Sequence, residues 1–302
     1  MFKLIALTQT NIKIKIGNGG FGMKKRIITN QNINSFKKYL LENEKAPATI
    51  EKYMRDIRCF AEYAAECMLD KALVLNYKGM LEQKYAVRST NSMLAALNAF
   101  LRFVGWHDLC VKQFKIQKEA YCSEKKEITK AEYVSLVRVA EQKKNERLSL
   151  VIQTICGTGI RVSELQSITV EAVRRGEAVV SCKGKTRKIF IVKALQKKLL
   201  RYANEQEIVS GILFVTKSGK PLDRSNIWRQ MKDLCKQAGV SPEKVFPHNL
   251  RHLFARTFYG IERDIAKLAD ILGHSNINTT RIYIITTGAE HQRRMENMRL
   301  II

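Results

Sequence analysis

The chain has 302 residues, 45% of them hydrophobic, which is enough for one large domain or two ordinary ones with a real core and excludes global disorder. Lysine and arginine total 53 against 28 acidic residues, and this formal net charge of +25 predicts a polyanionic partner, most often nucleic acid. The seven cysteines are scattered and include no C-x-x-C pair, which argues against a zinc site or a disulfide framework and for a reducing cytoplasm. No apolar run reaches membrane-spanning length.

The N-terminus contains a glycine-rich motif, GNGGFG at 17–22, that fits the G-x-G-x-x-G of a phosphate-binding loop. Such a loop needs a helix or strand of its own behind it, and MKKRIITNQN supplies neither. We therefore interpret residues 1–26 as a basic, flexible extension. The region does not resemble a secretory signal, and Met23 is an alternative start.

Residues 27–115 show the periodicity of a helical domain. In 49–66 and again in 88–104, apolar side chains recur at a spacing of three to four, which predicts two amphipathic helices. Thr49 follows Pro47 and is the predicted cap of the first helix. The stripes consist of Ile50, Tyr53, Ile57, Phe60 and Ala64, and of Leu94, Leu97, Leu101 and Val104.

Basic side chains lie between these stripes, among them Lys52, Arg55 and Arg88. The ordinary interpretation is a solvated basic face. The net charge of the chain favours a surface that contacts DNA.

Residues 116–127 form the predicted linker, within a charged stretch that has lost helical periodicity. The sequence T-x-x-E at Thr129–Glu132 is a capping box that opens a second, mostly helical domain over 128–302. Within it, 177–192 reads as two β-like segments around a Lys/Gly turn, which predicts a hairpin.

Five side chains of the second domain suggest chemistry on a phosphodiester: Arg161, His248, Arg251, His274 and Tyr283. A tyrosine can attack phosphorus and form a covalent ester, provided that it loses its proton. Arginines suit the non-bridging oxygens because their planar fork binds two oxygens and stays charged. A proton donor must also serve the leaving 5′-oxygen.

Taken singly, each of these residues has an ordinary explanation. Arg161 and Glu164 could be a surface ion pair, and Tyr283 in RIYII could be a core tyrosine. The turn Gly157-Thr158-Gly159 is expected to start a helix on which Glu164 holds Arg161. His248 and Arg251 are spaced for one helix face.

Two further features belong to the same motifs. Gly273 is the predicted C-cap that precedes His274. His252 completes an H-x-x-x-H with His248, but there is no H-E-x-x-H and no obvious third ligand. We therefore interpret His252 as a structural hydrogen-bonder and expect no metal.

The motifs together resemble the tyrosine recombinase (phage integrase) family, especially its Xer-like and mobile-element members. They are TGIRVSEL at 158–165, CKGKTRK at 182–188, HNLRH at 248–252 and LGHSNINTTRIY at 272–283. The match covers 124–290, and the N-terminal helices are similar to the family's core-binding domain. The resemblance implies a mainly α fold with a small β-sheet: a SAM-like helical domain followed by a mixed α/β catalytic domain.

The resemblance also implies roles for individual residues. Tyr283 is the nucleophile that forms a 3′-phosphotyrosyl bond, and Arg161 and Arg251 clamp the scissile phosphate. His248 assists proton transfer and binds the phosphate, and His274 hydrogen-bonds the phosphate.

Glu164 and His252 support this site. The general acid is a hairpin lysine. Lys183 fits the family pattern best, although Cys182 replaces a glycine of that pattern, and the chemistry alone does not choose among Lys183, Lys185 and Lys188.

The implied activity is site-specific recombination or integration of double-stranded DNA without ATP, metal or cofactor. The resemblance implies a homotetramer on two DNA sites, joined by an amphipathic C-terminal tail, in a prokaryotic cytoplasm at the nucleoid. The alternatives are a type IB topoisomerase, a metal-dependent nuclease and a DNA-binding protein without catalysis. The sequence does not specify the recombination site, accessory proteins, or whether the process is integration, excision or dimer resolution.

Overall fold

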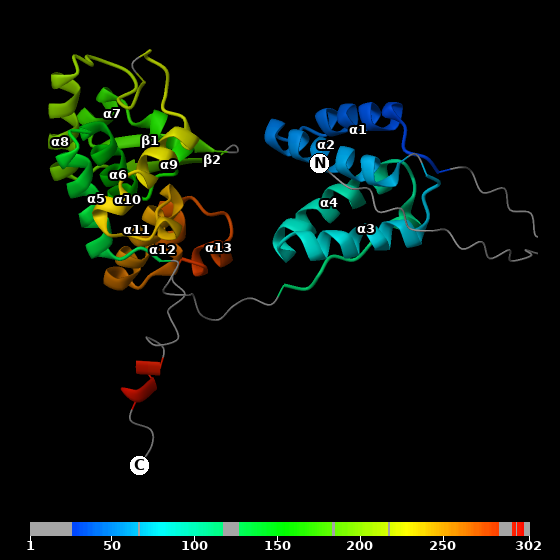
Figure 1. Ribbon diagram of the computed structural model, residues 1–302. Coiled ribbons are helices and arrows are strands. Elements are labelled where there is room, and N and C mark those ends of the chain that lie inside the picture. The colour runs from blue at the N-terminus through cyan, green and yellow to red at the C-terminus, as the bar shows by residue number, and fades with distance from the viewer. Residues whose placement is uncertain are drawn as a thin grey trace, which may run out of the picture. The chain divides into compact units, whose positions relative to one another are not determined.

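The computed structural model describes residues 26–65, 67–116, 127–182, 185–216, 218–283, 292–293 and 295–298 (Figure 1). The chain divides into two compact units, with the boundary between Lys118 and Glu119. The predicted glycine-rich motif, Met23, Lys183 and most of the predicted linker lie outside the described residues.

The N-terminal unit consists, in its described part, of four α-helices and one short 3-10 helix: α1 (Asn30–Glu42), α2 (Pro47–Ala64), α3 (Lys71–Lys84), α4 (Val87–Phe103) and η1 (His107–Leu109). Each α-helix contributes one apolar face to a shared core. Both predicted stripes are confirmed, since Ile57, Phe60, Leu94 and Leu97 are fully or almost fully buried there.

The start of α2 differs from the prediction. Thr49 does not cap it, because the helix begins two residues earlier at Pro47, with Ala46 at the cap position and no capping side chain. Proline is favourable at the first helical position because its φ is already helical and it leaves no N–H unpaired. Thr29 is a side-chain cap in this unit, since it forms a capping box with Asn32 at the start of α1.

Two asparagines of α4 hold the chain that leaves this unit. The Asn98 amide donates to the Val111 carbonyl (2.7 Å) and accepts from its N–H (2.9 Å). Asn91 bonds both backbone groups of Phe114 at 2.9 and 2.8 Å. A side-chain amide thus satisfies the backbone where no helix or strand does, and the packed part of the unit reaches residue 114.

The C-terminal unit is also mostly helical. Its elements are α5 (Lys130–Gln142), α6 (Glu146–Thr158), η3 (Val162–Ser167), α7 (Val170–Arg175), β1 (Glu177–Cys182), β2 (Lys185–Phe190), α8 (Lys193–Glu205), α9 (Arg224–Lys232), α10 (Cys235–Ala238), η4 (Pro242–Lys244), α11 (Pro247–Glu262), α12 (Ile265–Leu272) and α13 (Ile277–Arg281). The predicted capping box at the start of α5 is confirmed, since Thr129 and Glu132 each accept the other's backbone N–H.

The predicted hairpin is confirmed as an antiparallel pair of β1 and β2, the one sheet among the described residues. Its register places Glu177 opposite Phe190, where β2 ends, two residues before the predicted limit. Alternate side chains face inward, as strand geometry requires: Val180 and Ile189 are buried, while Phe190 is 67% exposed.

The C-terminal unit contains a main core and a small second cluster. The small cluster brings together Ala255 of α11, Leu268 and Leu272 of α12, and Tyr283, which follows α13. Helix α12 contacts both α11 and α13 (Figure 1). Tyr283 therefore packs against α11 and α12 rather than against the main core. Among the described helices, none has the length and apolar character needed to cross a membrane.

Candidate active site

Helix α11 carries two of the predicted site residues. Pro247 occupies its first helical position, so the helix begins just ahead of His248. His248 and Arg251 are three residues apart and therefore neighbours on one face. Arg251 is 1% exposed, whereas His248 remains open to solvent.

The Arg251 guanidinium is held by main-chain carbonyls. It donates to the carbonyls of Gly159 and Leu272 (2.6 Å), and its Nη2 lies 3.1 Å from His274 Nε2. Among the described residues no carboxylate pairs with it, and its Nε has no hydrogen-bond partner. Burial, followed by the charge of Arg161, lowers the pKa of Arg251 to about 10. A buried cation without a counter-ion is poised to bind an anion.

The expected helix around Arg161 is different in kind. Gly159 ends α6 in a left-handed conformation instead of starting a helix, and Arg161 is the cap of the 3-10 helix η3. The predicted contact with Glu164 is present. The guanidinium donates to Glu164 Oε1 (2.9 Å) and the Arg161 N–H donates to Oε2 (2.9 Å). Arg161 Nη2 donates to the Gly273 carbonyl at 3.3 Å.

Arg187 of β2 is a site residue that the sequence analysis missed. It donates to both carboxylate oxygens of Glu164 (2.9 and 2.7 Å) and, through Nε, to the Ile271 carbonyl (3.1 Å). Burial favours a higher pKa for Glu164, but Arg187 and Arg161 outweigh it and lower the pKa to about 2. The sequence did contain a signal for this contact. Arg187 precedes Ile189 by two residues, so both side chains lie on the inward face of the same strand.

Two glycines allow these arginines to reach the backbone. A Cβ on Gly159 would lie 2.5 Å from the Phe254 ring, and one on Gly273 would lie 2.7 Å from Arg187 Cδ. Both glycines have a positive φ, +65° and +64°, which residues with a side chain rarely adopt. Their carbonyls accept from Arg251 and Arg161 respectively.

His274 follows the C-cap glycine of α12, as predicted. Its Nδ1 lies 2.9 Å from the hydroxyl of the buried Thr280, and its Nε2 faces Arg251. Burial, followed by Arg251 and Arg161, lowers the pKa of His274 to about 4. The imidazole is therefore neutral at pH 7, with its orientation fixed by bonds on both ring nitrogens.

Tyr283 is 5% exposed and is surrounded by imidazoles. Its hydroxyl lies 3.2 Å from His248 Nε2. The ring centroids of His252 and His274 are 4.2 and 5.2 Å from that of Tyr283. Although part of the His248 side chain is exposed, desolvation of its ring, followed by repulsion from His252 and Arg251, lowers the pKa of His248 to about 4, so the imidazole is neutral at pH 7.

Of the three hairpin lysines that are candidates for the general acid, the structure describes the side chain of Lys188. Lys183 and the side chain of Lys185 lie outside the described residues. Lys188 is exposed and pairs with Glu177 across the hairpin at 3.0 Å. It sits at an outward position, opposite Val179.

The three predicted DNA-binding residues of the N-terminal unit differ in how far their side chains are bonded within that unit. The Lys52 amino group is bonded to Asp56 (2.5 Å) and to the Ser92 carbonyl (2.9 Å). Arg55 and Arg88 are exposed, and Arg55 Nε also lies 3.5 Å from Asp56 Oδ1. Lys52 thus serves its own unit, which the sequence pattern did not indicate.

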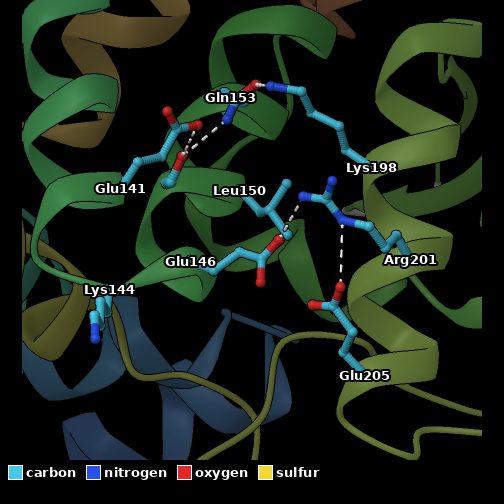
Figure 2. Close-up of a pocket in the computed structure, with 9 residues that line it drawn as sticks. Glu141, Lys144, Glu146, Leu150, Gln153, Lys198, Arg201 and Glu205 are labelled. Carbon is cyan, nitrogen blue, oxygen red and sulfur yellow. Dashed lines mark hydrogen bonds and ion pairs between the residues drawn. The ribbon is translucent and has the colours of Figure 1, made fainter.

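A groove of about 370 Å³ lies between α6 and α8, away from these residues (Figure 2). Arg201 bridges Glu146 and Glu205 across it, and Lys198 donates to Gln153. Its lining residues on α6 run from Glu146 to Gln153, and Gln153 lies about 9 Å along the helix from Gly159 at a rise of about 1.5 Å per residue. Its ion pairs are internally satisfied, so we do not assign the chemistry to this groove.

No cluster of three or more His, Cys, Asp or Glu side chains suited to a metal ion occurs in the part of the chain that the structure describes. The pair His248 and His252, with ring centroids 4.8 Å apart, has no third partner of this kind there.

The two units match the two domains of one protein family. The phage integrase family matches residues 126–289, and the phage integrase N-terminal SAM-like domain matches residues 33–107. The chain belongs to the phage integrase family. This membership confirms the predicted resemblance and the predicted fold class, a mostly helical chain with a small sheet.

Relatives with assigned names are similar along nearly the whole chain. The tyrosine recombinase XerA of Thermococcus kodakarensis is 30% identical over 90% of this chain and 96% of its own. The tyrosine recombinase XerD of Halalkalibacterium halodurans is 26% identical over 85% and 94%.

Solved structures show the same fold at lower identity. A lambda integrase dimer bound to a COC′ core site has a TM-score of 0.69 at 19% identity and covers 86% of this chain and 96% of that one. The XerH site-specific recombinase bound to difH has a TM-score of 0.66 at 18% identity and covers 88% and 84%.

Proposed function

We propose that this chain is a site-specific tyrosine recombinase, which cuts and rejoins DNA strands through a covalent 3′-phosphotyrosyl intermediate. The observation that carries the proposal is the placement of the Tyr283 hydroxyl 3.2 Å from a neutral histidine, beside Arg251, a buried cation. The names of the relatives, tyrosine recombinases XerA and XerD, support the same activity.

In the first step Tyr283 attacks the scissile phosphorus. A bond forms between the phenol oxygen and phosphorus, the bond to the 5′-oxygen breaks, and the phenol proton passes to His248 Nε2. Arg161, Arg251 and His274 bind the non-bridging oxygens, on which negative charge builds up in the transition state. Arg251 meets this charge in a water-poor environment, where each contact is stronger.

The leaving 5′-oxygen takes a proton from a general acid, which we assign to Lys183 on the family pattern. The products are a 3′-phosphotyrosine and a free 5′-hydroxyl. In the second step a 5′-hydroxyl of the partner strand attacks the phosphotyrosine and gives its proton to Lys183, while the bond from phosphorus to Tyr283 breaks and His248 returns the proton to the phenol oxygen. One phosphoester replaces another in each step, so the sequence of reactions balances without ATP or an added cofactor.

A nicked duplex that traps the covalent intermediate tests this function. We expect the wild-type chain to form an SDS-resistant protein–DNA adduct, in the presence of EDTA as well, and Tyr283→Phe to form none. An adduct in Tyr283→Phe would overturn the nucleophile assignment. EDTA-sensitive cleavage without an adduct would replace the proposal with a metal-dependent nuclease, and relaxation of a plasmid that lacks a recombination site would favour a topoisomerase.

We propose that both units contact double-stranded DNA. In the N-terminal unit the exposed Arg55 and Arg88 are the phosphate contacts, while Lys52 contributes indirectly through its bond to Asp56. Affinity of this kind falls steeply with salt because bound counter-ions are released. The slope of the logarithm of affinity against the logarithm of salt should shrink by about 1 for each phosphate contact removed.

We propose that four copies assemble on two DNA sites and act in the cytoplasm of a prokaryote. The amphipathic tail supports this assembly, since Met295 and Met298 are 58% and 59% exposed and available for a neighbour. Light scattering of the chain with and without DNA tests it. The expected result is a tetramer with two duplexes, lost on deletion of residues 291–302; an unchanged assembly after deletion would rule out the tail.

A further inference from the structure

A partly buried polar cluster lies beside Tyr283, formed by Glu127, His252 and Arg256. The Glu127 carboxylate is 3.3 Å from His252 Nδ1 through Oε1 and 3.3 Å from an Arg256 terminal nitrogen through Oε2. Arg256 also donates to the Ile128 carbonyl at 2.6 Å. His252 in turn is packed against the nucleophile, with its ring centroid 4.2 Å from that of Tyr283 and the planes tilted by 36°.

The cluster is not fully hydrogen-bonded. Within the described residues, Glu127 Oε2, His252 Nδ1 and Arg256 Nε are buried and have no partner in hydrogen-bond geometry. Buried polar groups are normally paired, and the exceptions call for an explanation such as strain held at a functional site. A cluster that served only to stabilise the fold would be expected to satisfy these atoms.

The charge of Glu127 is secured by its neighbours. Burial favours a higher pKa for this carboxyl, but His252 and Arg256 outweigh it and the pKa is lowered. A carboxylate that faces Nδ1 favours a proton on that nitrogen and sets the plane of the imidazole. An imidazole oriented by a carboxylate, next to a nucleophile, is a recurring way to hold reacting groups in register.

We propose that Glu127 is a positioning residue for the nucleophile: it orients His252, and His252 holds the Tyr283 ring where the hydroxyl reaches His248 and the scissile phosphate. This inference rests on the proposed recombinase activity. Glu127 touches neither the phenol nor the phosphate, so its effect must pass through His252.

The test measures single-turnover formation of the adduct on the nicked duplex, with DNA affinity and thermal unfolding measured in parallel. We expect Glu127→Gln to slow cleavage about tenfold without changing DNA affinity, because small misplacements of a reacting group lower rates by up to about a hundredfold. An unchanged rate in a folded Glu127→Gln variant would overturn the inference.

Glu132→Gln is the matched control. Glu132 lies five residues further on, caps α5 through Thr129, and pairs with Lys244 at 2.8 Å. Its loss should lower the unfolding temperature and leave the rate of cleavage of the folded protein unchanged. Equal slowing by both variants would mean that Glu127 acts only on stability.

A double-mutant cycle separates positioning from a structural role. His252→Phe keeps a ring against Tyr283 but removes the nitrogen that faces Glu127, and it should slow cleavage by about the same factor. Adding Glu127→Gln to His252→Phe should then slow it no further. If the rate losses of the two single variants multiply in the double variant, the inference is overturned. A wild-type rate of cleavage in His252→Phe would also overturn it. An adduct in Tyr283→Phe would instead overturn the proposed function, which is a separate result.

Discussion

The N-terminal and C-terminal units place buried charge in different ways. In the N-terminal unit the buried carboxylate of Asp56 pairs with Lys52 of the same helix, one turn away. In the C-terminal unit Glu164 pairs with Arg187 across 23 residues, and Arg251 bonds the Gly159 carbonyl across 92. The buried carboxylate of the first unit finds its cations within its own helix, although Lys52 also donates to the Ser92 carbonyl of α4, whereas the buried charges of the second unit tie together segments that are distant in sequence.

The difference indicates what each kind of charge is for. A local pair can relax into solvent when its partner is lost, since the Lys52 side chain is already 30% exposed. A buried charge that bridges several segments cannot do so, and its removal leaves other groups unpaired. We expect the two units to respond differently to chemically similar substitutions.

The largest contrast is expected between two arginines. Arg251→Lys removes the fork that faces the phosphate and should slow adduct formation about 10²–10³-fold, the loss typical of one well-placed donor. Arg88→Ala in the N-terminal unit should lower DNA affinity and reduce the salt slope by about 1, with the rate at saturating DNA unchanged. Single-turnover rates over a salt series measure both effects. A similar loss of rate in Arg251→Lys and Arg88→Ala would contradict the expected difference between the two units.

Two buried carboxylates give the next contrast. Glu164→Gln leaves Arg161 and Arg187 without their counter-ion and should lower the free energy of unfolding by about 3–5 kcal/mol. Asp56→Asn should lower it by about 1 kcal/mol, because Lys52 can turn to water. Urea unfolding followed by circular dichroism checks both values. An equal loss would show that local and distant pairing are equivalent here.

A smaller contrast is expected between two glycines with positive φ. Gly273→Ala places a methyl group 2.7 Å from Arg187 Cδ and should cost about 1–3 kcal/mol while slowing cleavage. Gly105→Ala, at φ +80° with no atom within 4 Å of the new group, should cost about 1 kcal/mol from backbone strain alone. Thermal unfolding and adduct assays on both variants measure the difference. Normal cleavage by Gly273→Ala would argue against close positioning of Arg187.

The last contrast concerns the dependence of stability on pH. An unfolded histidine takes up a proton near pH 6.5, whereas burial and then Arg251 hold the pKa of folded His274 at about 4. The unfolded state therefore binds more protons in between, so stability should fall as pH falls from about 6.5 to 4 and level off below. His274→Gln should reduce this slope in thermal unfolding.

Much of the local structure followed from the sequence. The apolar stripes of α2 and α4, the capping box of Thr129, the hairpin and the C-cap at Gly273 depend on residues within a turn or two of one another. The spacing of His248 and Arg251 on one helix face is of the same kind. Two predictions were wrong: the residue at which α2 begins and the kind of helix that follows Gly159. Pro47 begins one helix and the left-handed Gly159 ends another, and each boundary depends on a single residue.

The sequence by itself determined the inventory of chemical groups, the order of the two domains and the family motifs, since these depend on residue type and spacing. Only the tertiary structure decided that Arg187 shares Glu164 with Arg161, that Lys52 also reaches the Ser92 carbonyl, and that Glu127 reaches His252 beside Tyr283. Those contacts join residues far apart in the chain. The packing of separate helices brings these residues together. The helix or strand propensity of a segment does not specify which distant side chain it will contact.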